Sequence, residues 1–70
     1  MRFTAAVTRD GQWYVAQCLE IEVASQGESI EAALDNLREA LELKLEDEPV
    51  SPREPPLITT IEVTPRPSAA

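Results

Sequence analysis

The sequence predicts an α+β fold with the element order β-β-β-α-β, in which one helix packs on one face of a four-stranded sheet. Residues 30–46 carry apolar side chains at helical spacing, and four shorter runs have strand character, most of them alternating apolar and polar side chains. Prolines concentrate in the connector 47–56, between the helix and the last strand. Seventy residues allow one domain at most, and we expect it to span residues 1–64.

The first two predicted strands, residues 2–9 and 12–18, form a hairpin. Alternation in the first strand separates Phe3, Ala5 and Val7 from the threonines and alanine between them. Asp10-Gly11 follows directly, and this dipeptide between two strand-like runs indicates a tight turn, because both residues tolerate positive φ.

The third predicted strand covers residues 21–26 and leads into the helix. Gly27 supplies a position where φ can become positive just before the helix begins. Ser29 is placed to act as the N-cap, its hydroxyl accepting a hydrogen bond from a backbone N–H of the first turn.

The helix over residues 30–46 contains no proline or glycine and is rich in alanine, leucine and glutamate, which favour helices. At 100° per residue its apolar side chains fall on one face, which we expect to be buried: Ile30, Ala33, Leu34, Leu37, Ala40, Leu41 and Leu45.

Residues 57–64 alternate again and predict a fourth strand, after which the tail 65–70 is expected to fray. If the first three strands form an antiparallel meander, a right-handed crossover through the helix places the fourth strand beside the first, in the order 3-2-1-4. One helix covers only one face of such a sheet, so the other face stays open unless a partner or a second copy covers it.

Composition indicates a globular protein that does not bind nucleic acid directly. A net charge of −7 with only six scattered lysines and arginines argues against direct binding to nucleic acid and favours a cationic partner. Cys18 is the only cysteine, which excludes an internal disulfide. The N-terminus lacks the apolar run of a signal peptide, and no segment is long enough to span a membrane, so we expect a cytoplasmic protein.

Catalytic chemistry is not expected. The sequence has no histidine, which removes the usual general base and transition-metal ligand. Cys18 is either a small buried side chain or a group with a redox or inter-subunit role. We therefore predict no catalytic residues, no metal site and no cofactor.

Five acidic residues form a stripe about 80° wide along the predicted helix. Like charges at this spacing repel one another, and among the neighbouring residues only Arg38 offsets them. The stripe is either a solvated face that keeps a small protein soluble or a surface that attracts a basic partner. Its members are the candidate partner-binding residues: Glu31, Asp35, Glu39, Glu42 and Glu46.

Trp13 and Leu43 are the candidate contacts between subunits. Leu43 lies well off the apolar face of the helix, where it is either an isolated exposed leucine or part of an interface. Of Trp13 and Tyr14, one is expected in the core and the other exposed or at an interface, and the pattern leaves open which. With so small a core, we expect a homo-oligomer, a dimer or larger.

Several stretches together resemble the HicB-like antitoxin family. They are the Asp10-Gly11 turn with the strand after it, the turn Ser25-Gln26-Gly27-Glu28-Ser29, and the helix with its Asn36-Leu37-Arg38-Glu39-Ala40 centre. The resemblance covers roughly the first forty-eight residues. The sequence differs from it in having Leu19 where the family often has proline and Ala32 where it often has glutamate.

The resemblance implies a shortened ribonuclease H-like fold without catalysis, in a short form lacking the C-terminal DNA-binding module of many relatives. It also implies an antitoxin-like protein that neutralises a basic, messenger-RNA-cleaving toxin of the HicA type by masking its active surface. The alternative is a stand-alone oligomeric scaffold or small-ligand module that has lost its toxin partner.

Overall fold

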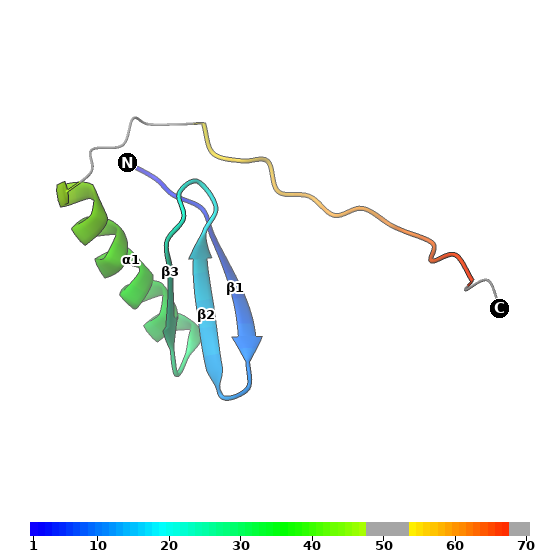
Figure 1. The fold of residues 1–70 in the computed structure, drawn as a ribbon, viewed down its shortest axis with the longest axis horizontal. Coiled ribbons are helices and arrows are strands. Elements are labelled where there is room, and N and C mark those ends of the chain that lie inside the picture. The colour runs from blue at the N-terminus through cyan, green and yellow to red at the C-terminus, as the bar shows by residue number, and fades with distance from the viewer. Residues whose placement is uncertain (48–53, 68–70) are drawn as a thin grey trace.

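The computed structural model describes residues 1–47 and 54–67. A three-stranded antiparallel sheet and one helix lie within residues 5–47. The elements are β1 (Ala5–Asp10), β2 (Trp13–Cys18), β3 (Ala24–Gly27) and α1 (Ile30–Asp47). β2 lies in the middle and pairs with both neighbours, and α1 crosses one face of the sheet (Figure 1). The α+β class with one helix on an antiparallel sheet is thus confirmed.

The hairpin between β1 and β2 forms at the predicted position. Asp10 pairs with Trp13, so the loop consists of Gly11 and Gln12. Gly11 has φ of 64°, and no other described residue has positive φ. Positive φ at the first loop residue alone matches a type II′ turn, whose twist suits the flanking strands.

The third strand begins later than the sequence predicts, at Ala24, and Gly27 has a different role from the one expected. The N–H of Val23 donates to the carbonyl of Ile21 (2.9 Å), so the chain turns tightly there. The carbonyl of Val23 accepts a hydrogen bond from the N–H of Cys18 (2.9 Å), and regular pairing with β2 begins at Ala24. The φ of Gly27 is not positive. Gly27 is instead needed because the start of α1 lies directly against its backbone.

The helix begins as predicted. The Ser29 hydroxyl accepts a hydrogen bond from the N–H of Ala32 (3.0 Å), which satisfies one of the unpaired donors of the first turn. Ile30, however, is 51% exposed, and its expected burial is wrong. The first turn meets the sheet at Gly27 through the small residues Ala32 and Ala33, which leaves Ile30 facing solvent.

The core lies between α1 and the face of the sheet that carries Tyr14, Ala16 and Cys18. Because side chains alternate along β2, Trp13 and Val15 lie on the opposite face, which no described element covers. Tyr14 packs against the core and Trp13 is 44% exposed, which resolves the alternative left open by the sequence. In the described part of the chain the buried apolar residues are few: Ala16, Cys18, Ala33, Leu37 and Leu41.

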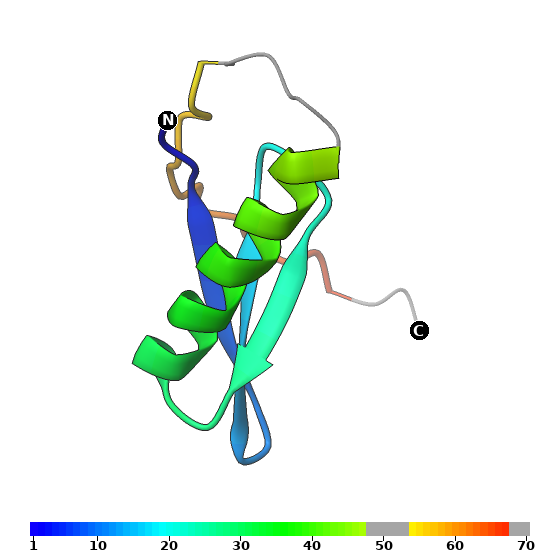
Figure 2. The ribbon, with the colours of Figure 1, turned by 90° about the vertical axis from the view of Figure 1, so that its left-hand side faces the viewer.

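Figure 2 shows α1 crossing in front of the sheet. The helix contacts β3 most and β2 next, and it makes few contacts with β1. In the described part of the chain, no strand pairs with the outer edge of β1. The sheet therefore ends in an unpaired edge on the side that the helix covers least.

The fourth strand and the order 3-2-1-4 are not confirmed. Residues 57–64 are exposed and form no strand, and the segment extends away from the sheet (Figure 1). Residues 48–53 of the predicted connector and 68–70 of the predicted tail lie outside the described residues, while 65–67 are exposed. Alternation alone gave residues 57–64 the character of a strand, but a strand forms only where a partner edge accepts its backbone.

Candidate functional site

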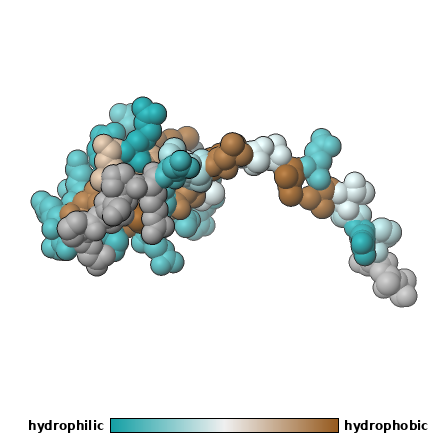
Figure 3. Space-filling view, turned by 90° about the horizontal axis from the view of Figure 1, so that it is seen from above, coloured by the Kyte–Doolittle hydropathy of each residue, from teal (hydrophilic) through white to brown (hydrophobic). Residues whose placement is uncertain are grey.

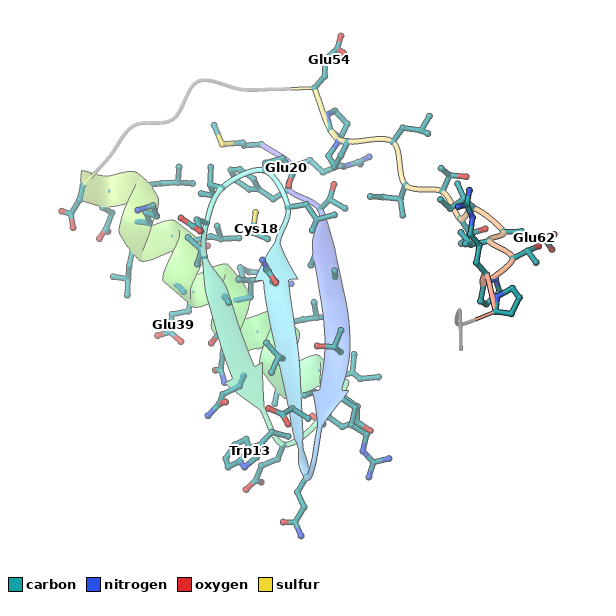
Figure 4. All side chains as sticks on the ribbon, turned by 45° about the vertical axis from the view of Figure 1, so that its right-hand side comes forward. Trp13, Cys18, Glu20, Glu39, Glu54 and Glu62 are labelled. Carbon is teal, nitrogen blue, oxygen red and sulfur yellow. The ribbon has the colours of Figure 1, made fainter. Side chains whose placement is uncertain are left out.

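The five acidic residues of the predicted stripe are brought together on the exposed side of α1. All five are exposed, while Ala33, Leu37 and Leu41 on the other side of the helix are buried. Figure 4 shows Glu39 projecting from α1 away from the sheet. We call the set Glu31, Asp35, Glu39, Glu42 and Glu46 the acidic face.

Arg38 offsets only part of this charge. One of its guanidinium nitrogens lies 3.6 Å from a carboxylate oxygen of Asp35, and the two side chains are 71% and 60% exposed. Ion pairs that are so solvated contribute about 0.2–1 kcal/mol at most. The acidic face therefore keeps a concentrated negative charge that acts over about one Debye length, roughly 8–10 Å in physiological salt.

The two candidate subunit contacts lie on different layers of the molecule. Trp13 is on the open face of the sheet, near the end of the hairpin (Figure 4), and Leu43 is 61% exposed on α1. The structure does not bring these side chains together, so no single flat patch contains both.

The sequence analysis did not identify a cluster of hydrogen bonds around Glu20. The backbone N–H of Thr4 donates to both carboxylate oxygens (2.8 and 3.1 Å), and the Thr4 hydroxyl donates to one of them (2.8 Å). These hydrogen bonds, the backbone donor first, hold the pKa of Glu20 below its ordinary value. Sixteen residues separate the partners, so no local pattern could have indicated the contact.

Cys18 belongs to this cluster and to the core. It is 2% exposed, and its thiol lies 3.5 Å from a carboxylate oxygen of Glu20, to which it donates weakly (Figure 4). The buried position agrees with the interpretation of Cys18 as a small core side chain. In the described part of the chain, no cluster of three or more histidine, cysteine or acidic residues is arranged to hold a metal ion.

An apolar groove of about 290 Å³ lies between α1 and the start of β1. It exists because the helix is displaced toward β3 and leaves β1 without a cover on that side. The residues that line it are mainly apolar, with one threonine and one arginine among them, and they include Phe3, Ala5, Leu34, Leu37, Arg38 and Leu41.

Fold and surface together define a small α+β domain with an acidic helix face and an uncovered sheet edge. The chain belongs to a family described as a family of unknown function (DUF7387), whose model matches residues 4–68. No curated protein and no solved structure matches the chain. None of the helices in the described residues is both long and apolar enough to cross a membrane.

Proposed function

We propose that this protein is an antitoxin-like binding protein that neutralises a basic, messenger-RNA-cleaving toxin of the HicA type. The family description assigns no activity, so the proposal is supported by the resemblance described above and by the physics of the surface. The observation that carries it is the acidic face: five carboxylates exposed along one side of a single helix.

The mechanism is electrostatic attraction followed by steric masking. A ribonuclease must present positive charge to bind RNA phosphates, and a row of carboxylates on a rigid helix complements that surface. Complementary fields accelerate encounter, and the bound domain then blocks access of RNA. No bond in the toxin is made or broken, and the protein acts without a cofactor, in the cytoplasm.

The finer features of the fold belong to the same proposal. A segment 57–64, of the same chain or of a second copy, forms the fourth strand beside β1, giving the order 3-2-1-4 and a shortened ribonuclease H-like architecture. The meander β1-β2-β3 followed by a helix on one face is compatible with this arrangement.

The experiment is a titration of the purified protein with the HicA-type toxin encoded beside it, at low and at high salt. We expect binding that weakens as salt rises, and Glu39→Lys/Glu42→Lys to slow association at least tenfold at low salt. The matched control is Glu22→Lys/Glu28→Lys, which changes the net charge equally at exposed positions outside the helix. Absence of binding at both salt concentrations would refute the proposal, and equal slowing by both variants would remove the acidic face from it.

A stand-alone oligomeric scaffold or small-ligand module is the second candidate. The observations that favour it are the apolar groove beside β1 and the exposure of Trp13 and Leu43. Two measurements in the absence of toxin test this candidate. A monomeric mass by light scattering would exclude the oligomeric scaffold. Trp13 fluorescence that does not change when small apolar ligands are added would exclude the small-ligand module.

A further inference from the structure

Residues 57–64 carry a cluster of apolar side chains that are largely exposed to solvent. Leu57 is 87% exposed, Ile61 83% and Val63 73%, and Ile58 follows at 65%. Figure 3 shows these hydrophobic residues in brown along the segment that extends from the body of the protein. Single exposed apolar residues are common, but a cluster of this kind indicates a surface that binds something.

The composition of the segment is that of a strand with one apolar side. In an extended strand Leu57, Ile61 and Val63 share one side with Thr59, and Ile58 is the one apolar residue on the other side. Most of the eight side chains are β-branched, which favours extended backbone. The family model extends to residue 68, so the segment is part of the domain that the family shares.

The outer edge of β1 is the matching acceptor. It offers unpaired backbone donors and acceptors, and the apolar groove lies directly beside it. A strand added there turns alternate side chains toward the helix, where Leu57, Ile61 and Val63 can fill the groove next to Phe3 and Leu34.

The charges of the two elements are complementary. Arg9 lies in β1 with Arg2 just before the strand, and Glu62 lies in the segment with Glu54 just before it. Either strand direction brings the acidic residues toward the arginines, and the parallel direction is the one given by a right-handed crossover from β3 through α1.

We propose that residues 57–64 of one chain form a parallel fourth strand on β1 of a second copy, and that the second copy returns its own segment to the first. The segment is directed away from its own β1, which favours exchange over folding back (Figure 1, Figure 4). Reciprocal exchange buries both apolar segments and the free β1 edge of each copy in one twofold-symmetric dimer. This inference is independent of toxin binding.

The first test measures molar mass in solution. Light scattering is expected to give twice the 7.7 kDa of one chain. Ile61→Lys places a charge on the apolar side of the segment and should give monomers, whereas Thr60→Lys, with the same charge on the neighbouring polar side, should leave the dimer intact. Circular dichroism of each variant checks that α1 is retained.

The second test identifies the chain that receives the segment. All chains carry Cys18→Ser, so that the introduced cysteines are the only ones. One chain carries Thr8→Cys, and a second chain, distinguished in mass by a tag, carries Thr60→Cys. A short bismaleimide is expected to link the two chains. A chain carrying both cysteines should give covalent dimers. Three outcomes overturn the proposal: a monomeric mass for the unmodified chain, internal cross-links in the chain with both cysteines, or a dimer that persists with Ile61→Lys.

Discussion

Gly27 and Ala33 are in such close contact that no side chain fits between them. A Cβ on Gly27 would lie 2.5 Å from the backbone nitrogen of Ala33, well inside van der Waals contact. Ala33 itself is completely buried. The distance between β3 and α1 is therefore set by the absence of a side chain at position 27, and the rest of the helix, including the acidic face, is positioned by this contact.

Gly27→Ala should destabilise the protein by about 1–3 kcal/mol or more, because the obstacle is helix backbone that can yield only if α1 shifts. Gly11→Ala is the matched control, with open space around the added methyl group but φ of 64°. It should cost about 1–2 kcal/mol through the backbone alone, and Gly11→Asn should recover part of that loss. Urea denaturation measures all three. Unchanged stability of Gly27→Ala would mean that the helix is not held where the structure has it.

The Glu20 carboxylate should make folding stability depend on pH. Its pKa is lowered in the folded state, chiefly by the N–H of Thr4, so its contribution is present above the ordinary glutamate value of 4.5 and is lost as pH falls through the lowered value. Glu20→Gln should therefore lower Tm most at neutral pH, and the difference from the unmodified protein should shrink in acid. The control is Glu22→Gln, an exposed neighbour. A difference in Tm that does not change with pH would contradict this role.

The elements that sequence predicted well are those determined by near neighbours. The Ser29 cap, the hairpin turn with positive φ at Gly11 and the helical spacing all act within a few residues, and each is found in the structure. The loop is Gly11 and Gln12, one residue later than the predicted Asp10-Gly11. The role of Gly27 and the hydrogen bonds of Glu20 depend on residues brought close only by folding. The surface divides in the same way: helical spacing predicted the acidic face, whereas alternation predicted a strand over residues 57–64 that the structure does not contain, because a strand also needs a partner edge.

Leu37→Ala should remove most of the stability of the domain. Leu37 is 3% exposed in a core that contains few large side chains, and truncation of a buried leucine costs about 2–5 kcal/mol. A domain of this size has little more than that in total. Leu43→Ala, on the exposed side of the same helix, should change the free energy of unfolding by less than about 0.5 kcal/mol. Similar losses for both variants, measured at low protein concentration, would show that Leu43 is buried in solution.

Asn36→Ala tests whether an exposed hydrogen bond helps to hold α1 against β3. Its amide nitrogen donates to the carbonyl of Gln26 (2.8 Å), just before Gly27. Two effects of Asn36→Ala oppose each other: alanine gains roughly 0.6 kcal/mol in helix propensity, and loss of the hydrogen bond costs about 0.5–1.5 kcal/mol. We expect a net loss of a few tenths of a kcal/mol in urea denaturation. Glu39→Ala, which changes propensity at an exposed helical position, should instead be neutral or slightly stabilising. If Asn36→Ala also stabilises the protein, the hydrogen bond contributes less free energy than the difference in helix propensity between asparagine and alanine. In that case the contact at Gly27 alone positions the start of α1.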